Sequence, residues 1–153
     1  MINIRPVRKD EIEDLQDLND EVFIDNQKYD SDLDMIWAKS DKGKDYFTKL
    51  LNNPDYCCLI AEEDGRKVGY VAAGPKNISY RKSKYIEVEN MGVIPEYRSR
   101  GIGTMLMEEC LKWAKSKGFQ KAYVNSYFNN QKAIEFYKRN GFSEIDLSLE
   151  KNL

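Results

Sequence analysis

The hydrophobic and polar positions along the chain change between two spacings. Apolar side chains recur every three or four residues between Ile12 and Phe23, which predicts a helix with Asp10 as its N-cap. A second helical region is predicted over residues 31–51, with an interruption at 41–43. The clearest helical pattern covers residues 101–117 and stops at Gly118. Its apolar stripe consists of Ile102, Met105, Leu106, Cys110, Trp113 and Ala114.

Shorter apolar runs predict strands at residues 2–7, 56–63, 67–73, 85–93, 120–125 and 143–149. The tight turn at 64–66 makes a hairpin of the second and third strands, and Gly74-Pro75 is expected to break the third. A last helix is predicted at 130–139. The order β-α-α-β-β-β-α-β-α-β predicts one α/β domain over residues 1–153, with a mixed, mostly antiparallel sheet between helices.

Composition narrows the classes of partner. The chain has 153 residues, of which 41% are hydrophobic and 33% charged, as in globular proteins. Lys and Arg number 24 against 26 Asp and Glu, so no basic excess points to nucleic acid. No apolar run approaches the ~20 residues of a membrane span, and the first residues lack the core of a signal peptide. We therefore expect a cytoplasmic protein without nucleic-acid or membrane partners.

The sequence contains no histidine. Ser-His-Asp triads, Cys-His dyads and His-ligated zinc are thus excluded. The three cysteines, Cys57, Cys58 and Cys110, form no C-x-x-C motif, so we expect neither a metal site nor a disulfide framework. Cys110 is expected in the core, together with at most one of Cys57 and Cys58. Catalysis must then rely on carboxylates, tyrosine, lysine, a thiol or the backbone.

Charge is distributed unevenly along the chain. Residues 9–34 contain eleven acidic and two basic side chains, whereas residues 98–139 contain nine basic and three acidic ones. One region therefore suits a cation and the other an anion. Two solvated helix faces would produce the same pattern.

An anion site is predicted between residues 93 and 104. A strand ends there, and after a short turn a helix opens on Gly101 and Gly103. The first amides of a helix are unpaired, and Arg98, Arg100 and Thr104 add charge and a hydroxyl. The dinucleotide fingerprint and the P-loop do not fit, because Leu106 replaces a glycine and no Gly-Lys-Ser/Thr occurs. The alternative is a glycine-rich helix start without a ligand.

Two motifs resemble the GCN5-related N-acetyltransferases, the GNAT family. Arg98-x-x-Gly101-x-Gly103 is similar to the family's Q/R-x-x-G-x-G/A signature, and residues 89–93 and 95–97 before it also look like that family. The second motif is Asn130-x-x-Ala133-Ile134-x-Phe136-Tyr137-x-x-x-Gly141-Phe142. One helix and one strand separate the two, as in the family. The first two thirds of the chain resemble it in element order alone.

The resemblance implies an acyltransferase that moves acetyl from acetyl-CoA to a primary amine by direct attack in a ternary complex. The amides of residues 98–104 would hold the CoA diphosphate, and the backbone at Met91 and Val93 would pair with pantetheine. The Met91 amide would also polarise the thioester carbonyl. Strands 85–93 and 120–125 would splay apart to admit the thioester. The implied cosubstrate-binding residues are Met91, Val93, Arg98, Ser99, Arg100, Gly101, Ile102, Gly103, Thr104 and Asn130.

Three side chains are candidates for proton transfer. By resemblance, Tyr137 is the general acid, and a phenol with a pKa near ~10 can protonate a leaving thiolate. Glu89 and then Glu87, expected on one face of their strand, are candidates for a base acting through water. The alternatives are a core aromatic role for Tyr137 and a salt bridge from a glutamate to Arg81 or Lys84. Asn125 stands where acetyltransferases of ribosomal-protein N-termini look to have a glutamate base, which counts against that subfamily.

The residues that would bind the amine acceptor are less clearly indicated by the sequence. An acidic, aromatic rim would suit a polyamine, a small amine or a peptide amine, although a solubilising loop is equally compatible. Its candidate residues are Asp25, Tyr29, Asp30, Asp32, Asp34 and Trp37. The family resemblance also allows a homodimer. Two other functions stay open: a non-catalytic acyl-CoA-sensing domain on the same fold, and a module for a different phosphate ligand.

Overall fold

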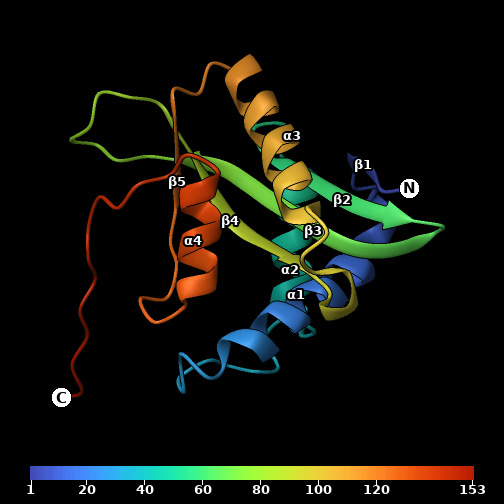
Figure 1. Cartoon of the computed structure of the whole chain (residues 1–153), viewed down its shortest axis with the longest axis horizontal. Coiled ribbons are helices and arrows are strands. Elements are labelled where there is room, and N and C mark those ends of the chain that lie inside the picture. Colours follow the sequence, from blue (N-terminus) through green and yellow to red (C-terminus); the bar gives the residue numbers. More distant parts are fainter.

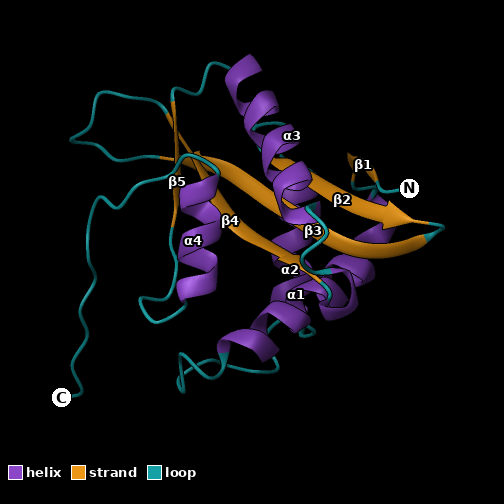
Figure 2. Cartoon of the chain, viewed as in Figure 1, coloured by secondary structure: helices purple, strands orange, loops and turns teal.

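The computed structural model describes all 153 residues around one five-stranded sheet (Figures 1 and 2). In sheet order the strands are β1 (Asn3–Pro6), β2 (Cys57–Glu63), β3 (Arg66–Lys76), β4 (Tyr85–Val93) and β5 (Lys121–Val124). Neighbouring strands are antiparallel except β4 and β5, which run parallel. A mixed, mostly antiparallel sheet was predicted, and this prediction is confirmed.

Helices cover both faces of the sheet (Figure 2). Helices α1 (Ile12–Asn26) and α2 (Asp41–Leu51) pack on one face, around a core that includes Leu15, Phe47 and Tyr70. Helix α3 (Ile102–Ser116) covers the other face, and α4 (Gln131–Arg139) packs partly buried side chains against the same core. None of the helices has both the length and the apolar character needed to cross a membrane.

Cys57 and Cys58 are both buried, which corrects the prediction that at most one of them faces inward. Cys57 points to the core under α3, where Cys110 also lies, and Cys58 points to the core under α1 and α2. Successive strand residues face opposite sides of a sheet. Because helices cover both sides here, both orientations are buried.

The predicted break of β3 at Gly74-Pro75 is wrong, because the strand continues to Lys76. Strand β2 pairs with β3 only as far as Ala73, so the end of β3 has β4 as its single neighbour. A proline without an amide hydrogen is tolerated where one side of a strand has no partner. Gly74 has a separate role, since a Cβ there would lie 2.1 Å from the ring of Tyr56.

The predicted strand at 143–149 is also absent, because residues after Gly141 form no regular element. The outer edge of β5 is free, but this segment does not pair with it. The chain instead leaves the body of the protein in an extended course toward its C-terminus (Figure 1).

The helix starts differ from the predicted ones as well. Asp10 lies in a 3-10 turn, η1 (Lys9–Glu11), and α1 begins after Glu11. Residues 31–40 are turns and bends rather than helix. Ser40 caps α2 by accepting a hydrogen bond from the Gly43 amide. A second 3-10 turn, η2 (Pro95–Tyr97), follows β4.

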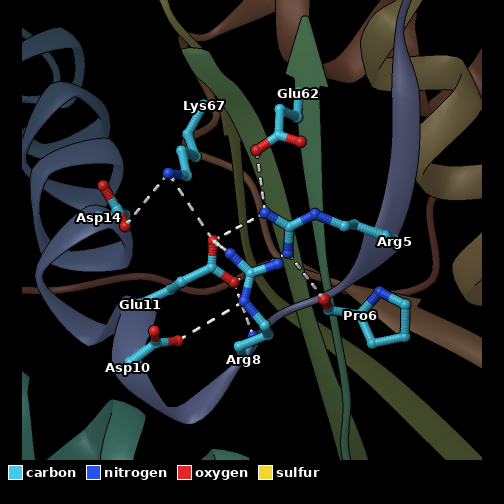
Figure 3. A network of polar contacts seen from close by, with 8 residues as sticks. All are labelled: Arg5, Pro6, Arg8, Asp10, Glu11, Asp14, Glu62 and Lys67. Atoms are coloured by element: carbon cyan, nitrogen blue, oxygen red, sulfur yellow. Dashed lines mark hydrogen bonds and ion pairs between the residues drawn. The ribbon is translucent and has the colours of Figure 1, made fainter. Parts of the chain in front are cut away.

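A buried carboxylate anchors the first strand to the first helix (Figure 3). Arg5 on β1 donates two hydrogen bonds to Glu11, at 2.8 and 2.7 Å, and a third to Glu62 on β2 at 3.0 Å. The amide of Arg8 also donates to Glu11. The hydrogen bonds from Arg5 lower the pKa of Glu11 to about 2, so the carboxylate is charged near neutral pH.

Candidate active site

Strand β4 continues beyond the end of β5. β5 pairs with β4 over residues Tyr85 to Val88 and ends at Val124. From Glu89 to Val93 the outer edge of β4 therefore has no strand partner. The edge is open because β5 ends; the splaying that the family resemblance implied stays a prediction.

A bulge lies where the pairing of β4 with β5 ends. Ala72 of β3 is opposite Asn90, but Ala73 is opposite Val88, which leaves Glu89 as an extra residue on β4. Such a bulge turns two consecutive side chains to the same face of a strand. Glu89 and Asn90 both hydrogen-bond the hydroxyl of Tyr46 on α2.

Backbone groups of Met91 and Val93 point toward the open edge. The amide of Ile94 donates to Val68 on β3 at 2.9 Å, and direction alternates along an antiparallel strand. Gly92 therefore faces β3, while Met91 and Val93 face outward. Arg98 Nε already donates to the Val93 carbonyl at 2.8 Å. The Val93 amide and both backbone groups of Met91 are left for a ligand.

The loop before α3 is built around two left-handed residues. Ser99 has φ 62° and Gly101 has φ 79°, and no side chain caps the helix. A Cβ on Gly101 would have no atom within 4 Å, so the space over these amides is open. Gly103 instead lies under α4, because a Cβ there would come within 3.1 Å of the Phe136 ring. The first amides of α3 are thus uncapped and accessible to an anion.

The other predicted loop residues divide into two groups. Ile102 is buried in the core under α3 and offers its backbone alone, whereas Thr104 is half-buried in the first turn. The guanidinium of Arg100 stacks on Tyr97 at 4.7 Å. That of Arg98 forms an ion pair with Asp25 at the end of α1. Arg98 therefore ties the loop to α1 and β4.

Residues following α1 contact the opposite side of the open edge. Tyr127, in the connection between β5 and α4, donates a 2.7 Å hydrogen bond to Asp30 and stacks on Tyr29. Together with the Asp25–Arg98 pair, these contacts join the end of α1 to both segments that flank the edge.

Helix α4 contributes Asn130 and Tyr137. The side-chain oxygen of Asn130 caps the helix by accepting from the Ala133 amide at 3.2 Å, which leaves its NH₂ group for a ligand. The Tyr137 ring packs between Phe136 and Phe142, with centroid distances of 5.4 and 5.8 Å. Burial raises the pKa of Tyr137, while its hydroxyl makes no hydrogen bond within the protein. The ring is thus a packing element and the hydroxyl is free to act.

Glu89 is held by a chain of hydrogen bonds that sequence reasoning missed. Tyr46 donates to Glu89 Oε1 at 2.6 Å and accepts from Asn90 at 3.0 Å. Asn19 on α1 in turn donates to Asn90 at 3.1 Å and to the hydroxyl of Tyr70 at 2.8 Å. One signal was available, since Asn19 is a polar residue on the apolar face of its helix. No pattern in the sequence around Tyr46 indicates that it would contact Glu89.

Glu87 lies on the same face of β4 as Glu89, as predicted, but has a different environment. Its carboxylate lies 3.7 Å from Lys76 Nζ, while burial raises its pKa. The alternative of a salt bridge to Arg81 or Lys84 is wrong, because Glu87 pairs with Lys76 and Lys84 Nζ donates to the Lys117 carbonyl. Arg81, one of the two expected partners, instead donates to the Tyr85 hydroxyl.

A cavity of about 450 Å³ opens onto Glu89. The Trp37 ring stacks on Phe23 at 5.7 Å and tilts against Tyr46 at 5.7 Å, so one wall is aromatic. Three of its lining residues are acidic. The lining consists of Phe23, Asp32, Leu33, Asp34, Trp37, Tyr46, Glu89 and Asn90. The predicted rim residues Asp32, Asp34 and Trp37 line this cavity, whereas Asp25, Tyr29 and Asp30 do not.

An uncapped glycine loop, the unpaired edge of β4 and a carboxylate on a bulge thus lie along one part of the structure. The model of the acetyltransferase (GNAT) family matches residues 12–142. The chain therefore belongs to the GNAT family, whose members are acyltransferases that use acetyl-CoA.

Relatives and solved structures agree with this assignment. An uncharacterised N-acetyltransferase of Methanocaldococcus jannaschii is 32% identical over 145 residues, which cover 94% of this chain and 62% of the relative. One from Archaeoglobus fulgidus is 32% identical over 81% of this chain and 85% of its own length. The PaiA N-acetyltransferase of Thermoplasma acidophilum, solved with coenzyme A, has the same fold. It has a TM-score of 0.81 and 23% identity, over 97% of this chain and 93% of that one.

Proposed function

We propose that this protein is an acetyl-CoA-dependent N-acetyltransferase that acetylates a primary amine on a cationic acceptor. One observation carries the proposal: the unpaired edge of β4 lies between an uncapped glycine loop and a carboxylate that lines an acidic cavity. An activated acyl group and an amine would meet at this edge. The three cysteines are free thiols, which suits the reducing cytoplasm.

The residues present fit acetyl-CoA. The open space over Gly101 leaves room for a diphosphate against the amides of residues 98–104. The outward backbone of Met91 and the Val93 amide would bind the pantetheine arm as an added strand does, and the Asn130 NH₂ group would contact the same arm. Acetyl-CoA supplies the acetyl group as a thioester, and the Met91 amide would donate to its carbonyl oxygen.

The two proton transfers are assigned to different side chains. Glu89 would accept the proton of the acceptor ammonium through water, and the Tyr46 hydrogen bond orients its carboxylate for this role. Tyr137 would donate its phenol proton to the leaving sulfur, and burial keeps that phenol protonated. Glu87 ranks second as a base because its carboxylate already forms an ion pair with Lys76.

The cavity supports a cationic acceptor. Asp32, Asp34 and Glu89 provide negative charge, and the rings of Phe23, Trp37 and Tyr46 form an aromatic wall beside them. A polyamine, a small amine or a peptide amine would each present a cationic group. All residues assigned a role in the proposed acetyl transfer come from one chain, so a homodimer is not needed for catalysis.

Release of free thiol from acetyl-CoA tests the proposal. The panel contains spermidine, amino acids, aminoglycosides, and peptides with free N-termini or internal lysines. We expect turnover with one class, and its loss in Glu89→Gln and Tyr137→Phe while acetyl-CoA still binds. Binding without turnover on any member would favour the acyl-CoA-sensing alternative. Stabilisation by ATP but not by CoA would overturn the assignment of the loop.

A further inference from the structure

Asn19 is a polar residue inside the hydrophobic core. It lies on α1 with no exposed surface, next to Leu18 in the core under α1 and α2. Its NH₂ group donates two hydrogen bonds, to the Tyr70 hydroxyl at 2.8 Å and to Asn90 Oδ1 at 3.1 Å. Its own Oδ1 is buried and has no partner. A buried polar atom without a partner destabilises a fold, which points to a role for Asn19 other than stability.

The hydrogen bonds that connect Asn19 to Glu89 all run in one direction. Glu89 as a carboxylate can accept but not donate, so Tyr46 uses its single hydrogen for the 2.6 Å bond to Glu89. Tyr46 must then accept from its other neighbour, and the Asn90 NH₂ group donates to it at 3.0 Å. This orientation turns Asn90 Oδ1 toward Asn19, which must therefore supply a donor.

The amide of Asn19 meets this requirement, which also explains its unpaired oxygen. An NH₂ group offers two donors, and here one is used for Asn90 and the other for Tyr70. The carbonyl oxygen belongs to the same amide and is left without a partner. If the Asn19 amide were turned over, its oxygen would face Asn90 Oδ1, and two acceptors would lie opposite each other.

The orientation of the Asn90 amide decides where the Tyr46 hydrogen goes. Without a donor at position 19, the hydrogen bond that holds Asn90 Oδ1 away from Tyr46 is lost. If the Asn90 amide then turns over, it presents Oδ1 to Tyr46 in place of NH₂. Tyr46 can donate to that oxygen instead of Glu89, and the candidate base loses the hydrogen bond that orients it.

We propose that Asn19 is a positioning residue for Glu89. By fixing the Asn90 amide, it directs the Tyr46 hydrogen to the carboxylate through three successive hydrogen bonds. Asn19 itself does not line the acceptor cavity, so it acts through these neighbours and not on the acceptor. Its effect on catalysis rests on the proposed function of Glu89 as a base, whereas the direction of the hydrogen bonds can be observed without turnover.

Kinetics of Asn19→Leu are the first test, because this variant removes both donors and keeps a side chain of similar size. At saturating acceptor kcat should fall about tenfold, as for the loss of a hydrogen bond to a charged group, while KM for acetyl-CoA stays unchanged. Leu18→Val is the matched control, since it disturbs the same core without removing any of these hydrogen bonds, and should keep the parent kcat. A parent-like kcat in folded Asn19→Leu would overturn the proposal.

The double variant Asn19→Leu/Asn90→Leu separates an effect on direction from an effect on stability. With no amide at position 90, Glu89 is the acceptor left for the Tyr46 hydrogen, so kcat should rise about threefold or more above that of Asn19→Leu. A role in stability alone predicts a further loss, because the double variant removes one more hydrogen bond. A double variant no faster than Asn19→Leu would therefore refute the proposed role.

Neutron diffraction from crystals of the parent protein in D₂O tests the direction itself, also if Asn19→Leu does not fold. Near neutral pH we expect the Tyr46 deuteron to lie toward Glu89 and the Asn90 ND₂ group to lie toward Tyr46. A Tyr46 deuteron directed to Asn90 would contradict the proposal even in an active enzyme. If the deuterons lie as expected but no amine of the panel is acetylated, the proposed function fails and the directed hydrogen bonds stand.

Discussion

The hydroxyl of Tyr46 on α2 donates a 2.6 Å hydrogen bond to the carboxylate of Glu89, which lies on β4 and 43 residues further along the chain. Burial and the neighbouring carboxylate raise the pKa of Tyr46 well above its usual range. The hydroxyl therefore stays protonated near neutral pH and can donate to Glu89. The candidate base is oriented by a residue from a different element, the helix that packs on its face of the sheet.

Replacing Tyr46 by Phe should slow catalysis without affecting cosubstrate binding. A hydrogen bond to a charged group contributes about 1.5–3 kcal/mol, so kcat should fall roughly 10- to 100-fold. Thiol-release kinetics and acetyl-CoA calorimetry measure the two effects separately. Tyr80→Phe, which removes an exposed hydroxyl, is the control. An unchanged kcat for Tyr46→Phe would exclude this role.

Tyr137→Phe tests the general acid. The ring packs between Phe136 and Phe142, so the variant keeps the packing and loses the hydroxyl alone. Loss of a positioned proton donor should lower kcat by about 100-fold or more. The melting temperature and the Kd for CoA should change little. Full activity in this variant would mean that the leaving sulfur is protonated by another group or by water.

Gly101→Ala should weaken cosubstrate binding. Gly101 has φ 79°, which costs a residue with a Cβ about 1 kcal/mol, and the methyl group would enter the space over the loop amides. We expect the Kd for CoA to rise about tenfold, as for one lost charged hydrogen bond.

Gly118→Ala is the matched control for the loop. Gly118 follows the C-terminal end of α3, has φ 88°, and likewise has no neighbour within 4 Å of a Cβ. The two variants should therefore lose similar stability, while CoA affinity falls in Gly101→Ala alone. Equal affinities in the two variants would argue against a diphosphate site at this loop.

Asp34→Asn tests the charge of the acceptor cavity. Removing one carboxylate from the lining should raise KM for a cationic acceptor about fivefold, or roughly 1 kcal/mol, and leave KM for acetyl-CoA unchanged. Asp45→Asn on α2 removes an exposed carboxylate outside the lining and serves as control. High salt should reduce the difference between the parent protein and Asp34→Asn.

The Arg5–Glu11 pair makes stability depend on pH in the acid range. The pKa of Glu11 falls from 4.5 to about 2 on folding, so its stabilising effect is complete above about pH 4.5 and disappears as the pH falls through 2. A shift of this size corresponds to about 3 kcal/mol. Glu11→Gln should lose roughly that amount at pH 7 and little near pH 2, as measured by urea unfolding. Glu13→Gln, an exposed neighbour on α1, should be neutral at both.

Features set by neighbouring residues could be predicted from the sequence. The spacing of apolar residues placed four helices and five strands close to their observed positions. The glycines at 101 and 103 indicated an uncapped helix start, because a left-handed backbone and a close helix contact need residues without a Cβ. Glu87 and Glu89 were placed on one face of their strand by the period of two.

Features that depend on residues distant in the chain were decided by the tertiary structure alone. The bulge at Glu89 results from the register between β3 and β4, and Tyr46 reaches Glu89 only because α2 packs on that face of the sheet. The pattern of residues 143–149 is that of a strand, but a strand needs hydrogen-bond partners, and this segment makes none with the free edge of β5 or with any other strand. Local sequence determines which elements can form, whereas hydrogen-bond partners supplied by distant segments decide which of them do.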